Sequence, residues 1–138
     1  AANTSSDYLH LRHLRVVCGT EGPQTAELSM TVDGVEKSVT ATGDGPVDAA
    51  FKAVSALFPH KARLQLYQVH AVTEGTDAQA TVSVRVEEDG RIATGQSADT
   101  DTVVASVKAY IGALNRLIVR RTKSAPASDG KRVILKTL

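Results

Sequence analysis

Apolar and polar residues alternate along much of the chain, and the alternation occurs in two similar blocks. Residues 20–34 read TEGPQTAELSMTVDG, and residues 73–90 read TEGTDAQATVSVRVEEDG. Both blocks open on Thr-Glu-Gly and end on Asp-Gly. Alternation is typical of a strand with one buried face, and Asp-Gly favours a hairpin turn because glycine accepts a positive φ. Each block therefore predicts a strand that enters a hairpin.

Further strands are predicted on both sides of each hairpin. The segments that precede the hairpins are LRHLRVVCG (11–19) and LQLYQVHAV (64–72), and those that follow are VEKSVTATG (35–43) and RIATG (91–95). Both following strands end in Ala-Thr-Gly. A glycine-containing turn is therefore expected before whatever comes next in each half.

A helical period comes next in each half. Apolar residues recur at helical spacing from about Val47 to Leu57 and from about Thr102 to Arg121. Pro46 suits a first helical turn, and Pro59 helps to end the first helix. The candidate caps of the second helix are Asp99, Thr100 and Asp101. The residues expected to face inward are Val47, Ala50, Phe51, Val54, Leu57, Val103, Val107, Tyr110, Leu114, Leu117 and Ile118.

The chain thus reads as βββα followed by βββα. One three-stranded sheet with one helix buries too little apolar surface to stand well alone. Two units, residues 9–60 and 61–121, are therefore expected to pack together as one α+β domain with approximate two-fold symmetry. The polar segment 1–8 and the segment 122–138, which begins with the turn-rich TKSAPASDGK, are expected to be tails.

Composition and charge narrow the range of partners. A formal net charge of +1 and an aromatic content of 4% argue against an extended nucleic-acid surface. The basic run that ends in Lys123 closes a predicted helix, where cations complement the helix dipole. No apolar run is predicted to be long enough to cross a membrane. The single cysteine, Cys18, fits a reducing compartment and is expected to be buried within its apolar run.

The familiar catalytic and cofactor motifs are missing from the sequence. GDGPVD supplies only two of the three glycines of a dinucleotide fingerprint, and no Walker sequence is present. No Cys/His set has the spacing of a zinc site, and no Gly-x-Ser-x-Gly elbow occurs. Nucleotide binding, metal binding and nucleophilic catalysis are therefore disfavoured.

The two glycine-containing turns remain as a candidate binding site. If the units pack symmetrically, the turns meet at the junction between them. A helix N-terminus can receive a carboxylate, and an aspartate or a carbonyl can receive an ammonium group. Small residues nearby would leave room for an apolar side chain, namely Ala49, Ala71, Ala78 and Ala98. The pattern would accommodate a zwitterionic amino acid, although by spacing alone turns that merely connect elements remain the preferred interpretation.

Several longer stretches resemble one protein family. GDGPVDAAF, LYQVHAVTEGTDAQATVSV and GQSADTDTVVASVKAYIGALNRL occur in order and at the proper spacing. Together they resemble the C-terminal regulatory domain of 2-isopropylmalate synthase, also called the LeuA dimerisation or allosteric domain. The resemblance covers residues 9–121. Citramalate synthase carries a related domain.

The resemblance implies a function that spacing leaves open. In this family the full enzyme condenses acetyl-CoA with 2-oxoisovalerate in a TIM barrel that depends on a divalent metal. The C-terminal domain dimerises and binds leucine as a feedback inhibitor. No barrel sequence is present in these 138 residues. The chain is therefore expected to be a non-catalytic, cofactor-free piece of a cytoplasmic enzyme. Its expected partners are leucine, a second copy and the barrel, without nucleic acid or membrane.

The resemblance also implies which residues contact the effector. They come from the first loop, from LQLYQVHA, from GTDAQA and from a second loop, GQSAD, which lacks the Gly-x-Gly-Pro form of the first. The full set is Asp44, Gly45, Pro46, Val47, Asp48, Leu64, Tyr67, Ala71, Asp77, Ala78, Gly95, Gln96, Ser97 and Ala98. Three alternatives stay open: an isoleucine-binding domain of citramalate synthase, a purely structural dimerisation module, and a small self-contained enzyme.

Overall fold

Eight elements follow one another in the order that the sequence predicts. The structure is a computed structural model that describes residues 7–71 and 79–124, with the side chains of residues 71 and 120–124 outside that description. The first half holds β1 (Leu9–Val17), β2 (Gln24–Val32), β3 (Val35–Gly43) and α1 (Pro46–Leu57). The second half holds β4 (Arg63–Ala71), β5 (Ala80–Glu88), β6 (Arg91–Asp99) and α2 (Thr102–Ser124). The predicted α+β fold of two βββα units is confirmed.

Each half forms its own antiparallel sheet, with strand orders β1-β2-β3 and β4-β5-β6. The two Asp-Gly turns join the second and third strands of each sheet. Asp33 and Gly34 have φ values of 53° and 82°, and Asp89 and Gly90 have values of 53° and 81°. Two successive positive φ angles are typical of a tight two-residue hairpin, which explains why glycine occupies the second position.

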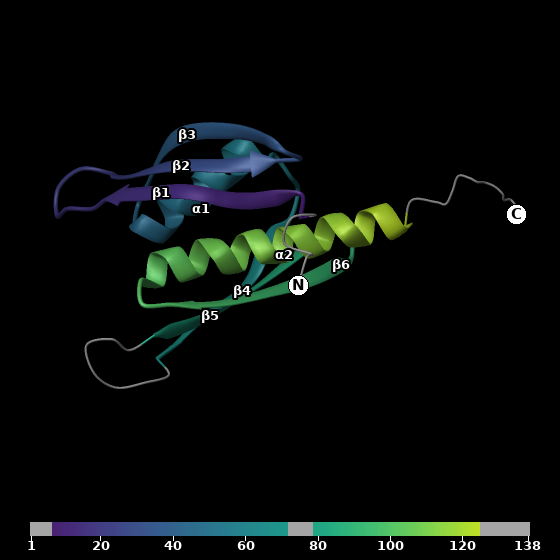
Figure 1. Cartoon of the computed structure of the whole chain (residues 1–138). Coiled ribbons are helices and arrows are strands. Elements are labelled where there is room, and N and C mark those ends of the chain that lie inside the picture. The colour runs from purple at the N-terminus through teal and green to yellow at the C-terminus, as the bar shows by residue number, and fades with distance from the viewer. Residues whose placement is uncertain (1–6, 72–78, 125–138) are drawn as a thin grey trace, which may run out of the picture.

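The helices pack between the two sheets. Helix α1 packs on β2 and β3, and α2 packs on β5 and β6 while also touching β1 and α1 (Figure 1). The buried residues of both halves form one cluster. The central strands supply its buried alternate positions, which are Ala26, Leu28, Met30 and Val32 in β2 and Val82, Val84 and Val86 in β5. The two units therefore share a single core.

Small residues let each helix approach its sheet closely. A Cβ built at Gly95 would overlap the carbonyl oxygen of Ala109 and lie 2.6 Å from the amide nitrogen of Ala113. A Cβ at Gly43 would lie 2.5 Å from the amide nitrogen of Ala49. These two glycines are therefore explained by packing inside the chain.

The third strand of the second half differs from the prediction. Strand β6 continues to Asp99 instead of ending at Gly95, because it pairs with β5 along its whole length, from Arg91 to Asp99. The last residue of β3, Gly43, thus corresponds to Asp99 rather than to Gly95. The shared Ala-Thr-Gly sequences are not equivalent positions, and the turn predicted at residues 95–98 is wrong. Helix α2 also runs to Ser124, beyond the predicted end of the domain at residue 121.

Two further sequence-based expectations are corrected. Cys18 is exposed, not buried, because it follows the last residue of β1. The segment Thr102–Val119 of α2 is long and apolar enough, by length and composition, to cross a membrane, contrary to the sequence reading. Half of this segment is buried against the protein, and residues such as Val107 and Leu114 belong to the core. Its apolar character is therefore that of a core helix.

Candidate functional site

The start of α1 is open at Gly45. Gly45 caps the helix in an extended conformation (φ −153°, ψ 173°), and its carbonyl accepts a 2.9 Å hydrogen bond from the Ala49 N–H. Its cap makes no side-chain hydrogen bond to the helix. A Cβ at Gly45 would meet no atom of the described residues within 4 Å. Neither φ nor packing within the chain therefore requires glycine here, in contrast to Gly43.

The side chain of Asp48, in the first turn of α1, stabilises the turn before the helix. Its Oδ2 accepts a 2.9 Å hydrogen bond from the Asp44 N–H and lies 3.1 Å from Lys52 Nζ. These contacts lower the pKa of Asp48, chiefly through the Asp44 N–H and then through Lys52. The turn thus has a fixed shape, while the N–H groups of Val47 and Asp48 precede the first intrahelical hydrogen bond.

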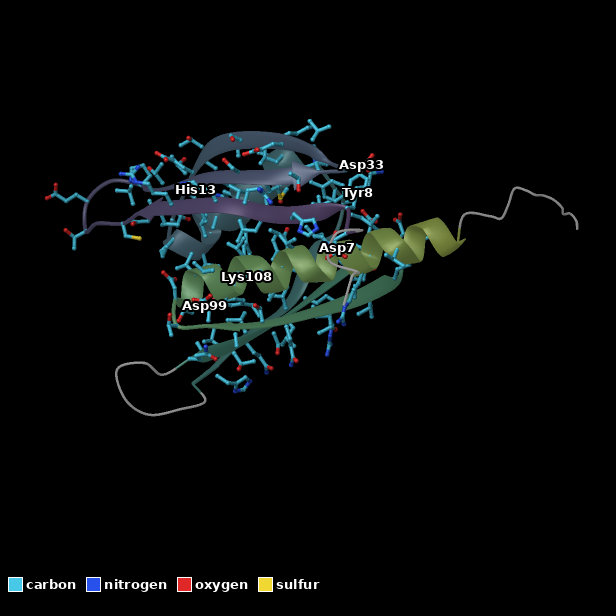
Figure 2. All side chains as sticks on the ribbon, in the orientation of Figure 1. Asp7, Tyr8, His13, Asp33, Asp99 and Lys108 are labelled. Atoms are coloured by element: carbon cyan, nitrogen blue, oxygen red, sulfur yellow. The ribbon has the colours of Figure 1, made fainter. Side chains whose placement is uncertain are left out.

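Helix α2 begins differently, because the side chain of Asp101, just before the helix, caps it. Asp101 Oδ1 accepts hydrogen bonds from the N–H groups of Val103 (2.8 Å) and Val104 (3.2 Å). Asp99 in turn accepts from the Asp101 N–H at 2.9 Å and lies 3.3 Å from Lys108 Nζ, a pair visible in Figure 2. Of the three predicted caps, Asp101 makes the hydrogen bonds to the helix. The first turn of α1 is therefore the one that leaves amide groups for an outside anion.

Tyr67 joins the two helices to β4. Its hydroxyl lies 2.7 Å from Ser106 Oγ, and Ser106 donates its own proton to the Thr102 carbonyl at 2.7 Å. Tyr67 is therefore the donor to Ser106. The Tyr67 ring also meets the Phe51 ring edge-on, with centroids 6.0 Å apart and planes at 88°. We call this meeting of Tyr67, Phe51 and Ser106 the seam, since it connects β4, α1 and α2.

A second polar cluster lies behind Phe51. The Phe51 ring stacks on Tyr110 at 4.3 Å, and the Tyr110 hydroxyl lies 3.1 Å from His60 Nε2 and 3.4 Å from Ser55 Oγ. The Ala62 N–H donates to His60 Nδ1 at 3.1 Å, so a neutral His60 carries its proton on Nε2. His60 therefore cannot act as the base for Ser55, although the two atoms are 3.2 Å apart. These contacts connect the linker between the units, which contains His60, to α1 and α2.

One face of β4 is apolar and uncovered. Leu64, Tyr67 and Val69 are 47%, 36% and 44% exposed. Their cross-strand partners are Val86, Val84 and Val82, which are fully buried under α2. Cross-strand partners share a sheet face. The described chain thus covers this face over β5 but leaves it open over β4.

The structure brings some predicted site residues together and separates others. Asp44 and Gly45 directly precede α1, residues 46–48 begin it, and Leu64 and Tyr67 lie on the open face of β4. Gln96 and Ala98 lie in β6 and are exposed, and Gln96 donates to Ser83 Oγ at 3.0 Å. The second loop therefore does not exist as a turn. In the second half, the structural counterpart of the first loop is the segment between β6 and α2.

Other predicted residues are only partly covered by the description. Asp77 and Ala78 lie outside the described residues, and Ala71 ends β4 with its side chain undescribed. Ser106 is a residue of the seam that was not predicted; its local signal is a serine on the apolar side of a predicted helix, and it is fully buried. Among the described residues, no group of three or more His, Cys, Asp or Glu side chains is placed to hold a metal ion.

These features define a class of protein before they define a family. A duplicated βββα domain with an open helix N-terminus and an uncovered apolar strand face has the architecture of an association module. Residues 1–118 match the family described as the LeuA allosteric (dimerisation) domain, and the chain belongs to this family.

Curated relatives agree with the family. The chain is 63% identical over 121 residues to the 2-isopropylmalate synthase of Caulobacter sp. (strain K31), which covers 88% of this chain and 23% of that protein. It is 55% identical over 120 residues to the 2-isopropylmalate synthase of Bradyrhizobium sp. (strain BTAi1 / ATCC BAA-1182), covering 87% and 23% of the two. The chain thus spans about 23% of the length of these relatives.

Proposed function

We propose that this chain is the leucine-binding feedback-regulatory and dimerisation domain of a 2-isopropylmalate synthase. The whole enzyme would condense acetyl-CoA with 2-oxoisovalerate in the cytoplasm, in a catalytic barrel that holds a divalent metal. The domain itself would catalyse no reaction. Membership of the allosteric domain family and the similarity to 2-isopropylmalate synthases support this proposal.

The open turn at Gly45 is the observation that carries the ligand-binding part of the proposal. A glycine that neither φ nor packing among the described residues requires, at the cap of a helix that no side chain caps, leaves space where a ligand can reach the backbone. The carboxylate of leucine would accept hydrogen bonds from the N–H groups of Val47 and Asp48, with help from the helix dipole. Its ammonium group would take carbonyl or carboxylate oxygens of the same turn, including those of Asp44.

The apolar side chain of the effector would lie toward the seam. Tyr67 stands beside Phe51 in the second turn of α1, and Leu64 lies on the same face of β4. Burying an isobutyl group contributes on the order of 1.5–3 kcal/mol, so the polar ends of the ligand must also be satisfied for useful affinity. Discrimination between leucine and isoleucine, which are isomers, would depend on the shape of the apolar surface at the seam, whereas the methylene that valine lacks is worth about 1–3 kcal/mol.

A second copy of the domain would cover the open face of β4. Three large apolar side chains exposed in a row are costly in water, and another protein surface can bury them. The family description, which includes dimerisation, supports a second copy as that surface. The same observation also fits a structural dimerisation module without an effector.

Titration calorimetry with leucine, isoleucine and valine tests the proposal. We expect leucine to bind most tightly and valine most weakly, because valine lacks one methylene of buried surface. Tighter binding of isoleucine would instead support the citramalate synthase alternative. If none of the three releases or absorbs heat, while the protein sediments as a dimer, the structural module is the better description.

A further inference from the structure

The side chain of Asn115 in α2 forms two hydrogen bonds to the backbone of Leu9, the first residue of β1. Its Oδ1 accepts a hydrogen bond from the Leu9 N–H, and its Nδ2 donates to the Leu9 carbonyl, each at 2.9 Å. Strand β1 is an edge strand, so the backbone groups of Leu9 that point away from β2 would otherwise lack a strand partner. The Asn115 amide acts as a short substitute for that missing strand. We call these two hydrogen bonds the Asn115 clamp.

The chain next to the clamp is fixed to the first unit. The Tyr8 carbonyl accepts a 2.7 Å hydrogen bond from the Asp33 N–H in the β2–β3 turn, and the two residues lie close together in Figure 2. The Tyr8 ring meets Phe58, just past the end of α1, with centroids 5.9 Å apart. The Leu9 side chain is buried in the shared core. Residues 8 and 9 are therefore the point where the start of the domain meets both units.

Helix α2 connects this point to the seam. Ser106, which holds the Tyr67 hydroxyl, and Asn115 belong to the same helix. They are about nine residues apart, or roughly 14 Å along a helix with a rise of 1.5 Å per residue. A regular helix moves largely as one body. A small shift of α2 near Ser106 therefore also displaces Asn115.

We propose that Asn115 is the positioning residue that couples the effector state of the seam to the start of β1, and through it to the chain that precedes the domain. This inference rests on the proposed function, because it requires an effector at the seam and a catalytic part upstream. A ligand that contacts Tyr67 and the first turn of α1 changes how α2 sits against them. The clamp transmits that change to Leu9, since it fixes both the donor and the acceptor of that residue.

The test uses the protein expressed at its full natural length. Asn115→Leu keeps the size of the side chain and removes both hydrogen bonds. Gln24→Leu is a matched control, because the Gln24 amide makes the same pair of 3.0 Å hydrogen bonds to the backbone of Gly19, but within the β1–β2 turn. Asn115→Asp is a second variant that keeps the acceptor for the Leu9 N–H and loses the donor to the Leu9 carbonyl.

We expect Asn115→Leu to bind leucine with a Kd within about threefold of the wild type and to keep its uninhibited kcat and KM. The ratio of the rate without leucine to the rate with saturating leucine should fall at least about fivefold or reach one, the lower range of typical allosteric coupling. Asn115→Asp should lie between wild type and Asn115→Leu. Gln24→Leu should be inhibited like the wild type.

Hydrogen exchange at the Leu9 amide gives a readout that does not depend on catalysis. Leucine should change the exchange rate of this amide in the wild type, change it less in Asn115→Asp, which keeps the acceptor for the Leu9 N–H, and leave it unchanged in Asn115→Leu. Full inhibition of Asn115→Leu, or of Asn115→Asp if the first variant does not fold, would overturn the coupling role. A loss of leucine affinity beyond tenfold in both variants would also overturn it, since the clamp would then support the binding site itself. Absence of leucine binding in the wild type would instead refute the proposed function.

Discussion

The Tyr67 hydroxyl donates a hydrogen bond to Ser106 Oγ at 2.7 Å, which ties an edge strand of the second sheet to the first turns of α2. Because the Ser106 hydroxyl donates its hydrogen bond to the Thr102 carbonyl, the Tyr67 hydroxyl is the donor in its contact with Ser106. The same ring leans on Phe51 of the first unit. One side chain thus fixes the relative position of three elements on which the proposed effector pocket depends.

Removing this hydrogen bond should loosen the pocket without unfolding the domain. We expect Tyr67→Phe and Ser106→Ala each to lower the free energy of unfolding by about 0.5–1.5 kcal/mol, the usual contribution of one hydrogen bond. The double variant should cost less than the sum of the two, because both remove the same interaction. Urea denaturation of the four proteins measures the coupling, and strictly additive effects would show that the contact is energetically silent.

Gly45→Asp should abolish leucine binding and leave the fold intact. The extended φ of Gly45 suits any residue, and a Cβ there meets no atom of the described residues, so the melting temperature should change by only a few degrees. The added carboxylate would fill the open turn and repel the carboxylate of leucine. Calorimetry measures the loss.

Gly45→Asn separates size from charge in that experiment. The amide has nearly the shape of the carboxylate but carries no charge, so we expect it to weaken binding less than Gly45→Asp. Unchanged leucine affinity in the aspartate variant would mean that the effector binds elsewhere.

A charge on the open face of β4 should disrupt the proposed dimer. Val69→Lys places an ammonium group where a second copy would need an apolar surface, so we expect a monomer at micromolar concentrations in sedimentation velocity experiments. Ile92→Lys is a matched control, because Ile92 and Val69 are both 44% exposed but Ile92 lies on β6 opposite Glu87. A dimer that survives Val69→Lys but not Ile92→Lys would place the interface on the other face of the sheet.

Tyr110 should make the domain sensitive to alkali. Burial raises the pKa of its phenol above the ordinary value of about 10, while the Ser55 hydrogen bond opposes the shift. The unfolded chain then loses this proton at a lower pH than the folded chain. The contribution of Tyr110 to stability is therefore fully present below about pH 10 and is lost as the pH rises through the folded pKa.

The matched variant for this prediction is Tyr110→Phe. It removes the titrating group and keeps the ring that stacks on Phe51. We expect its free energy of unfolding, measured in urea between about pH 8 and 11, to fall less steeply above pH 10 than that of the wild type. Parallel curves would mean that the phenol titrates equally in both states.

The residues that the sequence placed correctly share a local signal. Asp33-Gly34 and Asp89-Gly90 adopt the positive φ values that their hairpins need, and Val54, Val107 and Leu114 face the core as their spacing indicates. The repeat of these signals was enough to predict two βββα units. Such patterns depend only on backbone preference and on which face of an element is apolar, and both are written in neighbouring residues.

Only the tertiary structure determined which of these apolar faces are buried by another element. Strand β6 extends to Asp99 because β5 pairs with it, although Gly95 to Ala98 carry little strand signal. Leu64 and Val69 in β4 belong to the same kind of alternating apolar pattern as Leu9 and Leu14 in β1. Only Leu9 and Leu14 pack against the core. The helix starts also differ, since Asp101 caps α2 while Gly45 leaves α1 open. The seam and the Asn115 clamp join residues far apart in the chain, and no local pattern specifies a contact between distant segments.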